Sequence, residues 1–129
     1  MPRGPLAAQH VLLVEQPGAA RDILEAVLEA EGATVSAVAS ADEALRVFAS
    51  VEFDVVITAI RLDQDLHNGL WLFEQIRRAP HGFRVPVIAL TTGNPPALAH
   101  VGFAGVVVKP VNPLDIVALV IGAIGSRGA

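Results

Sequence analysis

Short runs of branched apolar residues alternate along this chain with amphipathic stretches, and glycine and proline separate them. Five such runs occur, over residues 10–15, 34–39, 54–58, 87–90 and 106–108. Mostly uncharged runs rich in valine and isoleucine are typical of strands that helices cover on both faces. Strict alternation of strands with helices predicts a parallel sheet joined by right-handed crossovers. We therefore predict an α/β fold, a doubly wound (βα)5 sheet of five parallel strands.

The amphipathic stretches carry helix start and stop signals. Apolar residues over 20–28 recur at the spacing of a helix with one buried face, and Gly32 ends that helix. Ser40 and Glu43 form a capping-box signature for the next helix. A last helix begins at a proline preceded by an asparagine cap and runs over residues 113–124.

The segment between the fourth and fifth apolar runs is less regular. Pro95 and Pro96 cannot continue a helix, so at most a short helix fits between Ala97 and Val101, ahead of Gly102. We therefore expect the fourth helix to be shortened.

A length of 129 residues suits one domain. We assign residues 1–9 to a flexible arm, 10–125 to the domain and 126–129 to a tail. Charged residues make up 17% of the chain and hydrophobic residues 53%, which excludes disorder as the main state. The longest uncharged apolar run, over residues 116–125, is too short to span a membrane.

Charge and cysteine content exclude several classes of function. A net charge of −4 has the wrong sign for a domain held to nucleic acid by phosphate contacts. A chain without cysteine forms no disulfide, thiolate metal site or cysteine nucleophile. We expect a cytoplasmic protein, because the first residues lack the long apolar stretch of a secretory signal.

Polar residues follow several of the predicted strands at the point where each strand ends. Glu15 and Gln16 follow the first run, Ala59 the third, Thr91 the fourth and Lys109 the fifth. Functional side chains of open parallel sheets gather beyond the carboxyl ends of the strands. An acid, a hydroxyl and a lysine at this edge are residue types of a phosphoryl-transfer site built on carboxylates and a metal.

This arrangement resembles the receiver domain of bacterial two-component response regulators, from about His10 to Ile124. The resemblance implies a flavodoxin-like strand order, 2-1-3-4-5, and a role in phosphorelay signalling. The matching segments are Val14-Glu15-Gln16 with residues 21–24, residues 41–45, 53–57, 69–78 and 86–91, and Val108-Lys109-Pro110.

In that family, two acids after the first strand bind magnesium, an aspartate ending the third strand accepts a phosphoryl group, and a hydroxyl and a lysine hold the phosphate. Glu15, Thr91 and Lys109 match this pattern, whereas Gln16 and Ala59 replace the second acid and the phosphoacceptor. Alanine has no nucleophilic oxygen, and magnesium prefers carboxylate oxygens. We predict no aspartyl phosphate, no cofactor, and weak or absent magnesium binding, with Glu15 as the residual candidate ligand.

Three further features bear on the predicted site: the switch position, the strand-end lysine and two acids in the loop after the third run. The family's aromatic switch position is Val106, which is too small to make the usual inward swing. We expect Lys109 to form an ion pair with Glu15, because an unpaired buried charge is costly. Asp63 and Asp65 could supply a substitute carboxylate, although acids in such a loop are more often simply solvated.

The last helix has more apolar positions than one face against the sheet can cover. We expect a homodimer or partner interface there, since exposed apolar patches usually mark interaction sites. The alternative is that the chain is a fragment whose missing domain covers this helix. The interface candidates are Leu114, Val117, Val120, Ile121 and Ile124.

Taken together, the residues predict a receiver-like signalling module that is not an enzyme. It acts through a protein partner, a histidine kinase or an output protein, and binds neither nucleic acid nor a membrane. Two alternatives remain open. One is a conventional phosphoaccepting receiver with an engineered alanine at residue 59, and the other is a small flavodoxin-like binder of a nucleotide or anion.

Overall fold

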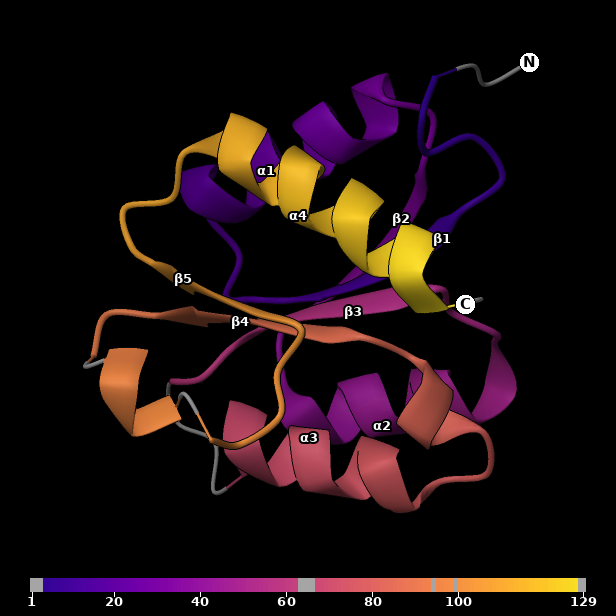
Figure 1. The fold of residues 1–129 in the computed structure, drawn as a ribbon. Helices are drawn as coiled ribbons and strands as arrows, with labels where there is room; N and C mark the ends of the chain where they lie inside the picture. The colour runs from indigo at the N-terminus through magenta and orange to yellow at the C-terminus, as the bar shows by residue number, and fades with distance from the viewer. Residues whose placement is uncertain (1–3, 63–66, 94, 99, 128–129) are drawn as a thin grey trace.

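A five-stranded parallel sheet lies at the centre of the molecule (Figure 1). The computed structural model describes residues 4–62, 67–93, 95–98 and 100–127. The strand order is β2-β1-β3-β4-β5, which confirms the predicted order. The strands are β1 (His10–Val14), β2 (Thr34–Val38), β3 (Val55–Ala59), β4 (Val87–Thr91) and β5 (Gly105–Val108).

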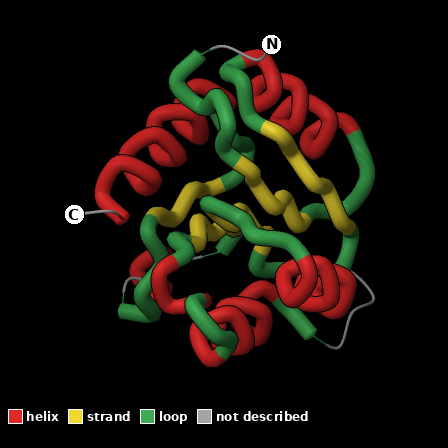
Figure 2. Tube along the Cα trace, turned by 90° about the vertical axis from the view of Figure 1, so that its right-hand side faces the viewer, coloured by secondary structure: helices red, strands yellow, loops and turns green. Residues whose placement is uncertain are grey.

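Helices cover both faces of this sheet, as Figures 1 and 2 show. α1 (Ala19–Ala30) and α4 (Pro113–Arg127) pack on one face. α2 (Ala41–Ser50) and α3 (Gly69–Arg78) pack on the other. The doubly wound α/β architecture predicted from the alternating pattern is therefore confirmed.

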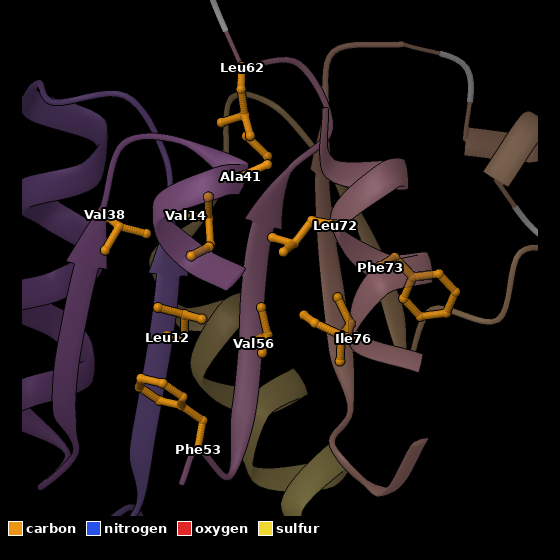
Figure 3. Close-up of a cluster of buried hydrophobic side chains, with 13 residues drawn as sticks. Leu12, Val14, Val38, Ala41, Phe53, Val56, Leu62, Leu72, Phe73 and Ile76 are labelled. Carbon is orange, nitrogen blue, oxygen red and sulfur yellow. The ribbon is translucent and has the colours of Figure 1, made fainter. Parts of the chain in front are cut away.

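Successive side chains of each inner strand enter opposite layers of the core, as strand geometry requires. In β1, Val11 and Leu13 join the cluster under α1 and α4, whereas Leu12 and Val14 join the cluster under α2 and α3. Figure 3 shows the second cluster, where Leu72 approaches the sheet from α3. Because both faces are covered, the strand sequences are continuously apolar.

Side-chain caps begin three of the helices. Ser40 Oγ accepts a hydrogen bond from the Glu43 backbone N–H at 3.1 Å, which confirms the predicted cap of α2. Asn68 caps α3 in the same way, and Asn112 Oδ1 accepts from the N–H of Leu114 at 3.0 Å. These bonds satisfy N–H groups that have no partner inside the helix.

The ends of the domain differ from the prediction. The expected flexible arm is partly packed: Leu6 is buried in the core beside α1, and its N–H donates to the carbonyl oxygen of Glu31 at 2.9 Å. That carbonyl lies at the end of α1 and needs a donor from outside the helix. At the other end α4 continues to Arg127, past the predicted limit of the domain at residue 125. No helix among the described residues is long and apolar enough to cross a membrane.

The fourth helical segment is a single turn, η2 (Pro95–Leu98). It begins two residues before the predicted start at Ala97. Proline is tolerated in the first turn of a helix, where the missing N–H would have no partner. Another single turn, η1 (Gly82–Arg84), precedes β4.

Gly69 opens α3 in close contact with the end of β3, and its replacement tests this packing. A Cβ at residue 69 would lie 2.3 Å from the carbonyl oxygen of Ala59, and backbone at that distance cannot move aside cheaply. We expect Gly69→Ala to lower the free energy of unfolding by about 1–3 kcal/mol in urea denaturation. The control is Gly122→Ala in α4, where a Cβ meets nothing within 4 Å. It should raise stability by about 0.5–1 kcal/mol, and equal effects of the two changes would contradict this packing.

Candidate functional site

The parallel sheet brings the predicted site residues to one edge. Glu15 follows β1, Ala59 ends β3, Thr91 ends β4 and Lys109 follows β5. The backbone N–H of Lys109 donates to the carbonyl oxygen of Thr91 at 2.8 Å, which aligns the ends of the last two strands. A cavity of about 290 Å³ opens at this edge. Its lining residues are Glu15, Gln16, Arg61, Leu90, Thr92 and Lys109.

An ion pair at this cavity joins the residue that follows β1 to the residue that follows β5. Lys109 Nζ lies 2.6 Å from Glu15 Oε2, with the carboxylate side chain 7% exposed and the lysine 30% exposed. The other carboxylate oxygen, Oε1, accepts a hydrogen bond from the backbone N–H of Gln16 at 2.9 Å. The expected pairing of these two residues is confirmed, and the lysine neutralises a carboxylate from which solvent is largely excluded.

Ala59 lies at the carboxyl end of β3 and is 1% exposed. Its methyl group belongs to the hydrophobic cluster under α2 and α3, together with Leu62 and Leu72. The side chain therefore offers packing surface at this position, and it has no oxygen that could attack phosphorus.

Thr91 uses its hydroxyl locally. The side chain is buried, and Oγ1 accepts a hydrogen bond from the backbone N–H of Gly93 at 2.9 Å. Thr92, the next residue, lines the cavity instead. The hydroxyl thus stabilises the turn that leaves β4, which is the structural role that side chains of this kind often have at strand ends.

Two polar side chains lie close to Glu15, Gln16 from the loop that enters α1 and Arg21 from the first turn of α1. The Gln16 Nε2 group donates to the carbonyl oxygen of Ala39 at 3.5 Å, near the end of β2. Arg21 Nη1 donates to the backbone carbonyl oxygen of Glu15 at 3.3 Å. Neither side chain adds a carboxylate to the edge.

Two further polar residues line the cavity at this edge. Arg61 and Thr92 line the cavity one or two residues beyond the ends of β3 and β4. Arg61 was not among the residues that we took from the sequence. Its signal was its position two residues after β3, the same offset that Gln16 has after β1. With Arg61, the lining has two cationic side chains and one carboxylate.

This set of donors does not fit magnesium. Glu15 supplies the one carboxylate among the described lining residues, and Lys109 engages it. Across the described part of the chain, no three His, Cys, Asp or Glu side chains converge on a point that could hold a metal ion. Magnesium prefers several oxygen ligands in octahedral geometry. The proposed substitutes, Asp63 and Asp65, lie outside the described residues.

The switch position is also apolar. Val106 lies in β5, half-buried, and pairs with Ala89 of β4. A β-branched side chain has one strongly restricted torsion and no ring to swing.

Two of the five predicted interface residues on α4 belong to the core. Val117 and Val120 are buried, and Ile124 is half-buried against the cluster under α1 and α4 to which Val120 belongs. Leu114 and Ile121 are exposed, at 72% and 39%. A helix advances 100° per residue, so positions 114 and 121 lie about 20° apart and roughly 100–120° away from Val120. Their exposure places them on the solvent-facing side of α4, next to Val117. The interface prediction is therefore wrong for Val117 and Val120.

A histidine holds the loop that returns from β3 to α3. His67 Nδ1 lies 2.9 Å from Asp42 Oδ1 at the start of α2. The imidazole also stacks on the Trp71 ring, with centroids 3.7 Å apart and planes 7° from parallel. The sequence alone does not show that His67, Asp42 and Trp71 meet.

The sequence of this chain is similar to those of known proteins. The family model for the response regulator receiver domain matches residues 11–121. An uncharacterized 14.6 kDa protein in the sodA1 3′ region of Leptolyngbya boryana is 31% identical over 119 residues, which is 89% of each chain.

Two solved structures extend the comparison to the fold. One is the receiver domain of a sensor histidine kinase from Pseudomonas aeruginosa, with magnesium coordinated in its active-site cleft. It is 29% identical, with a TM-score of 0.81, and the match covers 93% of this chain and 100% of that one. The other is a putative response regulator from Chloroflexus aurantiacus, which is 26% identical, with a TM-score of 0.82 and coverage of 91% and 98%.

A double-mutant cycle tests the ion pair at the strand edge. Glu15→Gln leaves the lysine without its carboxylate, and Lys109→Met leaves a buried carboxylate without its cation. We expect each single variant to lower the free energy of unfolding, and the double variant to lose less than the sum, with a coupling of about 1 kcal/mol or more. Urea denaturation at neutral pH measures all four proteins. Additive losses would show that the two charges do not stabilise each other.

Proposed function

Because this chain belongs to the response regulator receiver domain family, we propose that it is a signalling module that works by protein contact without phosphorylation at residue 59. The family match over residues 11–121 places it in two-component signalling. The alanine side chain at residue 59 has no nucleophilic oxygen, which supports the proposal that this position is not phosphorylated. We propose no enzymatic activity for it.

Ala59 is the observation that carries this proposal. It stands at the carboxyl end of β3, where the resemblance implies a phosphoacceptor aspartate, and its methyl group packs in the core. The neighbouring charges support the same conclusion, because Lys109 is paired with Glu15 in place of a carboxylate at residue 59. Because Glu15 already neutralises Lys109, this lysine is not needed as the partner of a phosphoryl group at residue 59.

We propose a protein partner from the same pathway, a histidine kinase or an output protein, in the cytoplasm. The similar Pseudomonas aeruginosa structure is itself the receiver domain of a sensor histidine kinase, which supports the kinase as one class of partner. The net charge of −4 does not favour nucleic acid as an alternative.

We also propose that two copies of the chain associate through the outward side of α4. Leu114 is 72% exposed and Ile121 39% exposed, and these positions are two helical turns apart on one side of the helix. Water contact with large aliphatic side chains is unfavourable, so their burial stabilises a complex.

Phosphoryl transfer tests the main proposal. The wild-type protein, incubated with phosphoramidate and magnesium, should show no mass gain of one phosphoryl group by intact-protein mass spectrometry. The double variant Ala59→Asp, Gln16→Asp should gain one phosphoryl group, because it restores the nucleophile and a second acid beside Glu15.

The matched control for that variant is Ala59→Asn with Gln16→Asp, which has the same size at residue 59 but no nucleophilic carboxylate. It should remain unmodified. A phosphoryl group on the wild-type chain would overturn the proposal.

Light scattering tests the dimer. At high micromolar concentration we expect the wild type to have twice the mass of one chain. Leu114→Glu with Ile121→Glu should reduce it to a monomer, because a charge cannot be buried cheaply in an apolar contact. Val51→Glu is the control, since Val51 is 40% exposed and lies after α2, away from α4. A monomeric wild type would refute the dimer.

A further inference from the structure

A groove of about 600 Å³ lies at the end of the sheet opposite the candidate site. It runs from α3 past the beginnings of β4 and β5 to α4, beside the edge strand β5. Its volume is within the range of pockets that bind small molecules or peptide side chains. Phe73, Arg77, Phe83 and Arg84 supply its large side chains, and we call it the arginine groove.

The turn at His81 and Gly82 precedes two of these side chains, Phe83 and Arg84. His81 adopts φ of +63°, a left-handed conformation that is uncommon for a residue with a Cβ. Gly82 follows, and a Cβ there would lie 1.7 Å from the carbonyl oxygen of Ile76. This turn leads directly into Phe83, which is 64% exposed, and Arg84. Strained backbone and an exposed aromatic ring in one short segment favour a binding role over a packing role.

Aromatic rings orient both guanidinium groups of the groove. The Arg77 guanidinium carbon lies 5.3 Å from the centroid of the Phe73 ring, and that of Arg84 lies 5.4 Å from the centroid of the Phe83 ring. Contacts of this kind hold a cation in place while leaving its N–H donors available. Both arginines are exposed, and neither is paired with an acid within the described ranges.

The charge of the groove contrasts with that of the whole protein. The chain has a net charge of −4, yet the described lining of the groove contains two arginines and no aspartate or glutamate. The rest of the lining is apolar or small, including Ala118 and Gly122 of α4. An apolar floor with two oriented cations at its rim is complementary to a ligand that combines an apolar side chain with carboxylates.

We propose that the arginine groove binds an acidic peptide segment of a partner protein. An apolar side chain of the segment packs on Phe83 and the floor of the groove, and its carboxylates accept hydrogen bonds from Arg77 and Arg84. The groove lies at the opposite end of the sheet from Ala59, so this binding does not depend on phosphoryl chemistry. Failure of this proposal would leave the proposed function of the receiver edge untouched.

NMR titration of the isotope-labelled 129-residue chain with three unlabelled peptides of equal length tests the proposal. The first alternates glutamate with leucine and phenylalanine, the second replaces each glutamate by lysine, and the third replaces each apolar residue by serine. The first should shift backbone amide signals around residues 73–77, 83–87 and 118–123. The second and third should bind about tenfold more weakly or worse.

Charge reversal supplies the matched comparison. Arg77→Glu with Arg84→Glu should lose the first peptide by about tenfold or more and gain the lysine peptide. Arg78→Glu is the control, because Arg78 is exposed on the same helix but does not line the groove. Equal affinity for all three peptides, shifts confined to other surfaces, or an equal loss in Arg78→Glu would each overturn the proposal. No binding of the first peptide at millimolar concentration would do the same.

Discussion

Burial of the central sheet on both faces is the constraint on which the rest of the structure depends. Every residue from Val11 to Val14 is fully buried, and β3 and β4 are buried along their whole length. Such strands tolerate a polar side chain at a strand end or where it has a partner, because an unpaired polar group in the core is costly. Thr58, fully buried within β3, donates its hydroxyl to the carbonyl oxygen of Ala59 at 2.9 Å. Glu15 and Thr91 are among the few buried polar residues of the described chain, and each lies at or just beyond a strand end.

The same constraint explains how the strand edge differs from a phosphoryl-transfer site. The parallel strands bring Glu15, Thr91 and Lys109 to the same edge of the sheet, and this placement alone does not make the edge a phosphoryl-transfer site. With alanine at residue 59, the lysine and the acid neutralise each other across 2.6 Å, and the Thr91 hydroxyl binds the turn after β4. Each group therefore has a structural partner at this edge. The contacts that we propose with other proteins use surfaces elsewhere, the arginine groove and the outward side of α4.

Much of the fold and of the candidate site could be predicted from local patterns. Doubly covered strands leave a continuous apolar run, and caps such as Ser40 and Asn112 act within a few residues of the helices they begin. The predictions went wrong where distant packing decides the outcome. The sequence around Leu6 predicts a flexible arm. In the structure its N–H donates to a carbonyl oxygen at the end of α1, and its side chain packs in the core. Val117 and Val120 look equivalent to Ile121 in sequence, and only the orientation of α4 on the sheet separates them.

The chemical limits of this protein follow from residue identity alone. An alanine at residue 59 has no nucleophilic oxygen in any fold, and a chain without cysteine has no thiol chemistry. The contact surfaces are different, because they assemble residues that are far apart along the chain. Arg77 and Arg84 become one cationic rim, and α4 becomes its neighbour, only when crossover connections bring α3, η1 and the last helix to the same end of the sheet. Local sequence patterns determine which elements form, whereas long-range packing determines which of their side chains meet.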